Sequence, residues 1–148
     1  MILLTVTLFL TSVMLPMATV AEGNETKDLP IVKIGFLNPI TGPIAVYAPG
    51  FGAAANIALG MMNIAGWGSG LQFELVMADS GCDGTAAATG AQTLVDAGVV
   101  AVAGAACSGA TMGANAILSA AGIPMISYAS TNPGLSDSTA YPLFFRVV

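Results

Sequence analysis

Short apolar runs of strand length alternate with segments of helix length along this chain, and this alternation constrains the fold more than any other feature. The apolar runs lie at Pro30–Leu37, Leu71–Ala78, Val99–Ala103, Pro124–Tyr128 and Pro142–Val148. The segments of helix length lie at Gly50–Ala65, Gly84–Ala97 and Ala110–Ala121. Continuous apolar strands that alternate with helices are typical of a parallel sheet buried on both faces. The sequence therefore predicts an α/β fold of three layers, with a parallel sheet between helices.

The residues between the runs support the same boundaries. Pro49 suits the first turn of a helix, Asp83 suits a helix N-cap, and Gly98 suits the turn that ends a helix. The segments 38–48 and 132–141 contain prolines and glycines and are expected to be loops, and Gly66–Gly70 is expected to be a turn.

The composition excludes several classes of function. The chain has 148 residues, enough for one domain with a core, but only 7% of them are charged. Its three basic residues cannot form a basic patch, so nucleic acid is not expected as a partner. Histidine is absent, which removes the commonest general base and the commonest metal ligand. We expect no cofactor, no metal and no enzymatic activity.

One pattern favours an enzyme. Gly50–Ala55, together with Asp79 at the end of the second apolar run, resembles the glycines and the acid of a dinucleotide-binding fingerprint. In that fingerprint the first glycine directly follows the first strand, whereas here Asn38–Pro49 intervene. The spacing therefore argues against a dinucleotide site.

Residues 1–21 are expected to be a signal peptide, followed by a linker over residues 22–30. Ile2–Leu15 is an apolar run, Pro16 ends it, and Thr19–Ala21 offers small residues for cleavage. The run is shorter than the roughly 20 residues of a membrane span, although an uncleaved anchor or a misassigned start are alternatives. Export to an oxidising compartment would permit a disulfide between the two cysteines, Cys82 and Cys107.

A membrane protein is a further alternative, because the mean hydropathy is +0.84 and Ile44–Ala65 carries no charge. Pro49, two asparagines and several glycines in and around this segment argue against it, as do the short strand-like runs on either side.

Small residues with hydroxyl groups follow two of the apolar runs. Gly104–Gly109 follows the third run and precedes a helix, and Ala129–Thr131 follows the fourth. The carboxyl ends of parallel strands meet at one edge of a sheet, and a helix N-terminus there offers unpaired N–H groups. The sequence therefore predicts a cradle for a small polar molecule. Ser108 could instead be only an N-cap, and Thr131 only a turn residue.

From Ile31 onward the chain resembles the type I periplasmic binding proteins of the branched-chain amino acid uptake family. The resemblance rests on VKIGFLNPITGPIAVYAPG, on MADSGCDGTAAATGAQTLVDAGVVAVAG, and on ACSGAT and MISYASTNPGLS. It implies a periplasmic receptor that closes two lobes on an amino acid or amide and delivers it to an ABC permease. Residues 31–148 would be a truncated N-terminal lobe. A ligand-sensing ectodomain of the same fold is the alternative.

The resemblance also implies roles for individual residues. Ser108 and Thr131 would hold the ligand's carboxylate, while the Ala129 carbonyl and the Thr131 hydroxyl would accept from its ammonium. Ala106, Cys107 and Ser130 would line the wall, and Tyr47 would pack against the ligand's side chain.

The same resemblance implies a disulfide between Cys82 and Cys107. Such a bridge would contribute about 3 kcal/mol by restricting the unfolded chain. Two buried thiols, or a redox or metal pair, are the alternatives.

Overall fold

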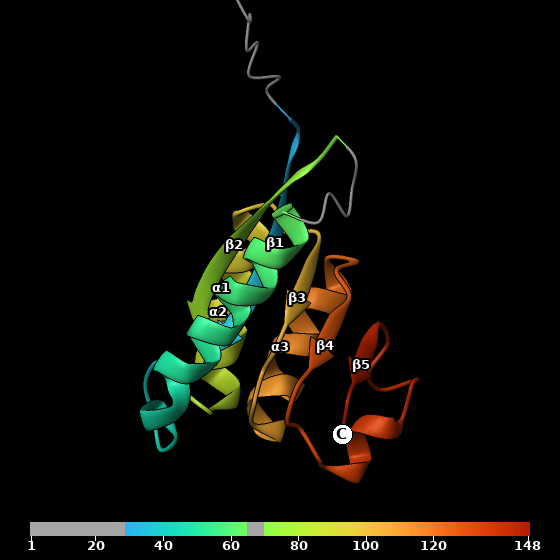
Figure 1. Cartoon of the computed structure of the whole chain (residues 1–148). Coiled ribbons are helices and arrows are strands. Elements are labelled where there is room, and N and C mark those ends of the chain that lie inside the picture. The colour runs from blue at the N-terminus through green and yellow to red at the C-terminus, as the bar shows by residue number, and fades with distance from the viewer. Residues whose placement is uncertain (1–28, 65–69) are drawn as a thin grey trace, which may run out of the picture.

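The computed structural model describes residues 29–64 and 70–148, which form one parallel sheet with helices on both faces (Figure 1). The strand order is β2-β1-β3-β4-β5, and every neighbouring pair is parallel. The strands are β1 (Ile31–Asn38), β2 (Gln72–Asp79), β3 (Ala101–Ala103), β4 (Met125–Ser127) and β5 (Phe144–Arg146). The expected signal peptide, nearly all of the linker and most of the turn at Gly66–Gly70 lie outside the described residues.

Three α-helices connect the first four strands. α1 (Ala48–Ile64) packs against β2 and β1 on one face, and α2 (Gly84–Asp96) and α3 (Ser108–Ala120) cover the other face (Figure 1). The chain runs from β1 to β2 on one side and then crosses to β3 on the other side of β1. This reversal puts α1 and α2 on opposite faces when crossovers are right-handed, whereas α3, which continues in the same direction as α2, shares its face. The predicted three-layer α/β fold is confirmed.

The core lies between the sheet and the α2–α3 layer. Leu37 and Val102 from the strands meet Leu94 from α2 and Leu118 from α3, and all four side chains are at most 1% exposed. Successive residues of β4 point to opposite faces of the sheet: Met125 is buried in this layer, whereas Ile126 is exposed on the other face. The face of each strand that turns toward α2 and α3 therefore carries most of the buried apolar surface.

Several boundaries differ from those predicted. The third strand begins at Ala101 rather than Val99, because the Val99 amide donates to the Leu94 carbonyl at the end of α2. The helix expected from Ala110 already begins at Ser108. Both expected loops contain a 3-10 helix, η1 (Ala45–Tyr47) and η2 (Pro133–Ser136).

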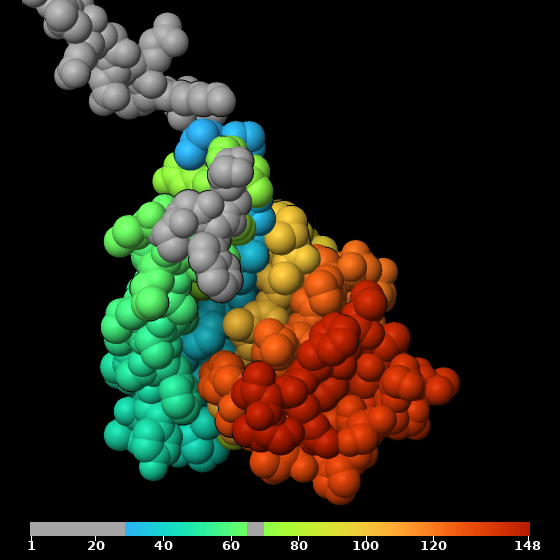
Figure 2. All heavy atoms as spheres, turned by 45° about the vertical axis from the view of Figure 1, so that its right-hand side comes forward, coloured from blue at the N-terminus to red at the C-terminus, as the bar shows by residue number. Residues whose placement is uncertain are grey.

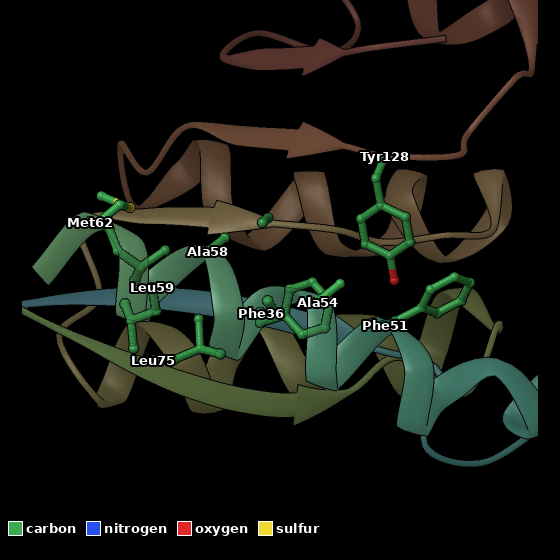
Figure 3. A pocket seen from close by; sticks show the side chains of 11 residues that line it. Phe36, Phe51, Ala54, Ala58, Leu59, Met62, Leu75 and Tyr128 are labelled. Atoms are coloured by element: carbon green, nitrogen blue, oxygen red, sulfur yellow. The ribbon is translucent and has the colours of Figure 1, made fainter. Parts of the chain in front are cut away.

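The face of the sheet that carries α1 is only partly covered by the described residues. A groove of about 440 Å³ runs between α1 and the strands, with Phe36, Leu59, Met62 and Tyr128 among its lining residues (Figure 3). In Figure 2 the groove is the hollow between teal α1 and the orange-red C-terminal segments, with β1 and β3 at its floor. Beyond it, Ile126 and its register partner Phe145 are 44% and 58% exposed.

The helical segment Ala45–Ile64 is, within the described residues, the one long and apolar enough to cross a membrane. Length and composition alone are weak evidence for a span. In the structure this helix packs along β1 and β2, and its Phe51 and Leu59 face the groove.

A close approach of two helix backbones fixes the α2–α3 layer. A Cβ atom placed on Gly113 of α3 would lie 2.1 Å from the carbonyl oxygen of Gly84, at the first residue of α2. No side chain fits at that distance, so the two helices pack backbone to backbone there. Gly60 of α1 is the opposite case, since a Cβ atom there would meet nothing within 4 Å.

We expect Gly113→Ala to lower the free energy of unfolding by about 1–3 kcal/mol, because the added methyl group pushes α3 away from α2. Gly60→Ala is the matched control and should raise it by about 0.4–1 kcal/mol, because alanine restricts the unfolded chain and favours a helix. Urea denaturation of both variants measures the difference. Equal effects of the two substitutions would contradict the close approach.

Candidate functional site

The carboxyl ends of the strands gather at one edge of the sheet, the lower edge in Figure 1. β1 lies between β2 and β3, so the chain reverses its direction across the sheet at this strand. Ligands of open parallel sheets bind outside the carboxyl ends at such a reversal. We call the segments that follow the strands here, residues 39–47, 79–83, 104–109 and 128–132, the rim.

The first two rim segments are joined by Asp79, the last residue of β2. Its carboxylate accepts hydrogen bonds from the Thr41 hydroxyl at 2.5 Å, from the Thr41 amide at 3.1 Å and from the Gly81 amide at 2.8 Å. Gly42 lies close by with φ +88°, and a Cβ atom there would lie 2.1 Å from the Gly81 carbonyl oxygen. Glycine is therefore required at 42 by both conformation and space.

These hydrogen bonds change the pKa of Asp79. Burial is the largest single effect and raises the pKa of this carboxyl, but the donors from Thr41, Gly81 and Ile40 together outweigh it. The pKa of Asp79 is thus lowered from its ordinary value of 3.8. The carboxylate stays ionised and holds the loop over residues 39–47 at neutral pH.

The second and third rim segments are joined by the disulfide between Cys82 and Cys107, whose Cα atoms lie 5.2 Å apart. This confirms the bridge that the family resemblance implied. The bridge ties the loop before α2 to the residue before α3.

α2 and α3, which both start at the rim, differ at their N-termini. The Asp83 carboxylate caps α2 by accepting from the Thr85 and Ala86 amides at 2.8 and 3.0 Å, so the predicted N-cap is confirmed. The N-cap position of α3 is Cys107, which makes no capping hydrogen bond with its side chain. The first N–H groups of α3 are therefore not satisfied by a cap, and such groups attract an anion.

Ser108 is the first residue of α3 rather than its N-cap. Its hydroxyl oxygen accepts a hydrogen bond from the Asn132 amide at 3.1 Å, which joins the third and fourth rim segments. A hydroxyl that accepts one hydrogen bond still has its own proton to donate. Ser108 can therefore act on a ligand as a donor.

Buried hydroxyls fix the fourth rim segment from below. The Ser127 hydroxyl donates to the Ala105 carbonyl at 2.6 Å and accepts from the Ser130 amide at 2.9 Å. The Ser130 hydroxyl is 2.8 Å from that of Thr111 and 3.2 Å from the Ala105 carbonyl. Sequence reasoning missed Ser127 and Thr111. The signal for Ser127 was its position two residues after the buried Met125, on the same strand face.

Ser130 differs from the other residues that the family resemblance implies for the ligand wall. Its side chain is fully buried, and its hydroxyl bonds within the lobe. In this structure the side chain supports the fourth rim segment from below.

The other expected site residues lie at the rim. Ala129 and Thr131 are exposed on the fourth segment. Cys107 is partly buried, and Ala106, at 7% exposure, is nearly covered. The structure thus gathers Ala106, Cys107, Ser108, Ala129 and Thr131 on two neighbouring segments.

Tyr47 lies further along the rim, at the end of a row of aromatic rings. Its ring, on a side chain 60% exposed, is 6.2 Å from that of Phe51, and the Phe51 ring is 5.2 Å from that of Tyr128. Tyr128 stacks on Phe36 at 5.7 Å, and burial raises the pKa of Tyr128 to about 12. Figure 3 shows Tyr128 pointing from β4 toward Phe51 of α1. The row links the outer loop to the floor of the groove.

Arg146 at the end of β5 was not predicted to belong to the site. Its Nη1 donates to the carbonyls of Asn132 and Ser130 at 2.9 and 3.3 Å, and its Nη2 to the Ser136 hydroxyl at 2.6 Å. These contacts span 10–16 residues of sequence, so no local pattern indicates them.

The structure also bears on the dinucleotide interpretation. Gly50–Ala55 lies inside α1, and a loop and η1 separate it from β1. The glycines are therefore not at a strand-to-helix turn, which the fingerprint requires. Among residues 29–64 and 70–148, no cluster of three or more His, Cys, Asp or Glu side chains could hold a metal.

The lowered pKa of Asp79 predicts a pH dependence. A carboxyl whose pKa is lower in the folded state stabilises the fold fully above its unfolded pKa, and loses that contribution as pH falls through the folded value. Below about pH 4, wild type should therefore lose more stability than Asp79→Asn. Urea denaturation at pH 7, 4 and 2 measures this difference. Thr41→Val removes one donor and should raise the Asp79 pKa in an NMR titration, whereas an unchanged value would contradict the contact.

Reduction of the disulfide should lower the free energy of unfolding by about 3 kcal/mol, because it frees a loop of 25 residues in the unfolded chain. Denaturation with and without a reductant measures the loss, and mass spectrometry confirms the added protons. The variant with both Cys82→Ser and Cys107→Ser should be insensitive to the reductant. A chain purified from an oxidising compartment with two free thiols would contradict the bridge.

Comparison with known proteins agrees with this geometry. Residues 31–148 match the family described as periplasmic binding protein. The leucine-, isoleucine-, valine-, threonine- and alanine-binding protein of Pseudomonas aeruginosa is 37% identical over 117 residues, 79% of this chain and 31% of that protein. The branched-chain amino acid transporter substrate binding protein LivJ of Streptococcus pneumoniae, solved in complex with isoleucine, has 35% identity and a TM-score of 0.71 over 78% of this chain and 33% of that one.

A shorter match concerns a receptor. Metabotropic glutamate receptor 6 of Rattus norvegicus is 54% identical over 50 residues, which are 34% of this chain and 6% of the receptor.

The chain thus spans about a third of the length of the binding proteins that it matches. The match extends over the whole described sheet and its rim, and it is to substrate-binding proteins. By sequence and by fold, the chain belongs to the periplasmic binding protein family.

Proposed function

We propose that this chain is the N-terminal lobe of an extracytoplasmic substrate-binding protein that takes up a branched-chain or related small amino acid, or an amide. The observation that carries the proposal is the rim, where the uncapped N-terminus of α3 lies beside the exposed Thr131. Donors from two strand ends converge there without a buried formal charge. The names of two relatives include branched-chain amino acids, in one case together with threonine and alanine.

The rim suits the two charged ends of an amino acid. The Ser108 hydroxyl, the first amides of α3 and the Thr131 amide are donors for a carboxylate. The Ala129 carbonyl and the Thr131 hydroxyl are acceptors for an ammonium group. Ala106 and Cys107 line the wall and Tyr47 lies against the ligand's side chain, whereas the buried Ser130 supports the segment.

The wider setting follows from the family. In this proposal residues 1–21 direct export, residues 22–30 form a linker, and residues 31–148 close on a second lobe beyond Val148. The protein acts in the periplasm, passes its ligand to an ABC permease, and catalyses no reaction. It needs no cofactor, since the rim recognises both charged groups by hydrogen bonds.

A ligand-sensing ectodomain is the second candidate, favoured by the match to a metabotropic glutamate receptor. Gene neighbours separate the two candidates. Permease and ATPase genes beside this one support transport, whereas a transmembrane signalling region in the same reading frame supports sensing.

Ser108→Ala and Thr131→Ala should each weaken the binding of leucine, isoleucine or valine by about 5- to 150-fold in the full-length protein. This corresponds to about 1–3 kcal/mol for leaving a charged ligand group without its partner. Isothermal titration calorimetry measures the affinities. Ser119→Ala, on α3 but more than ten residues along the helix from its rim end, is the matched control and should bind like wild type. Unchanged affinity in both rim variants would overturn the proposed site.

A further inference from the structure

Arg146 holds the backbone on both sides of Thr131. Its Nη1 donates to the carbonyl of Ser130 and to that of Asn132, so one guanidinium nitrogen joins two peptide groups of the fourth rim segment. Its Nη2 donates to the Ser136 hydroxyl in η2 at 2.6 Å. In the sheet, Arg146 is the register partner of Ser127, whose hydroxyl accepts from the amides of the same segment.

These contacts determine the direction of the Thr131 amide. In a trans peptide the N–H points opposite to the C=O of the same plane. Because the Ser130 carbonyl points at Arg146, the Thr131 N–H points away from Arg146. The next peptide is fixed too, since the Asn132 N–H donates to the Ser108 hydroxyl oxygen at 3.1 Å.

A cationic side chain is well suited to holding two backbone carbonyls in place. Hydrogen bonds from a charged donor are shorter and stronger than those between neutral groups, and the planar guanidinium fork keeps its donors in a fixed arrangement. The segment it holds is otherwise exposed at Ala129, Thr131 and Asn132. Without Arg146, two carbonyls would lose their donor, and the Thr131 peptide could rotate.

We infer that Arg146 is a positioning residue for ligand recognition. It aims the Thr131 amide, and through the Asn132–Ser108 hydrogen bond it keeps Ser108 in register with that amide. The anionic group of the ligand then meets donors from two rim segments in one fixed arrangement. This inference rests on the proposed function, because it assumes that the rim binds the carboxylate of an amino acid.

The test compares two ligands, L-isoleucine and L-isoleucinamide, which differ only in the carboxylate. In the full-length protein we expect Arg146→Met to weaken isoleucine binding about tenfold or more and isoleucinamide binding much less, measured by calorimetry. Arg146→Lys keeps a cation without the fork and should be intermediate. If Arg146→Met does not fold, Arg146→Lys takes its place in the comparison.

Lys33→Met is the matched control. Lys33 also donates to a backbone carbonyl, that of Ala97, but it does so near the start of β1, away from the rim at the strand's carboxyl end. Its loss should lower stability and leave the ratio of the two affinities unchanged. Hydrogen exchange gives a readout without ligand, since Arg146→Lys should speed exchange at the Asn132 amide while leaving that of Val102 in the core unchanged.

The possible outcomes distinguish the positioning role of Arg146 from the proposed function. If the Arg146 variants weaken both ligands equally, or leave the Asn132 amide as protected as in wild type, Arg146 has only a structural role and this inference is wrong. If the wild-type protein binds neither isoleucine nor any other small amino acid or amide, the proposed function is wrong, and the positioning role falls with it.

Discussion

The rim depends on one carbonyl oxygen, that of Ala105, which lies within hydrogen-bond distance of three buried hydroxyls. Ser127, Ser130 and Thr111 approach it at 2.6, 3.2 and 3.3 Å. A carbonyl has two lone pairs, so two hydroxyls can bond to it while the remaining one bonds to its neighbour, as the 2.8 Å contact between Ser130 and Thr111 allows. The protons of the three hydroxyls thus all have acceptors in a buried layer, where an unpaired group would cost about 1–3 kcal/mol. The segments after β3 and β4 are joined through this network before any ligand is present.

Much of the fold was predictable because it follows from local patterns. Apolar runs with strand length gave the five strands, and Asp83 marked the start of α2, because a carboxylate at that position satisfies helix amides whatever lies elsewhere. The start of α3 was misplaced by two residues, since Ser108 looks like a cap but its hydroxyl bonds to Asn132 instead. Sequence alone shows which groups can cap a helix but not which distant partner competes for them.

The site was predictable only in part, for a related reason. Thr131 and Ala129 follow an apolar run, so the parallel sheet places them at the rim. Ser130 has the same neighbours, yet it is buried, because the segment turns its side chain toward Thr111 on α3. Arg146 reaches the rim from β5, over a separation of 14–16 residues. Such contacts depend on the three-dimensional path of the loop between β4 and β5, which leaves no periodic signal.

The backbone contact between Gly84 and Gly113 has a consequence for the thermodynamics of recognition. It locks α2 to α3, the disulfide joins the starts of both helices, and the donors of the rim are attached to that unit. The conformational entropy of these donors is therefore lost when the lobe folds and not when a molecule arrives. A ligand that binds these donors does not have to order them, so binding loses less conformational entropy. More of the free energy of the contacts then contributes to the affinity.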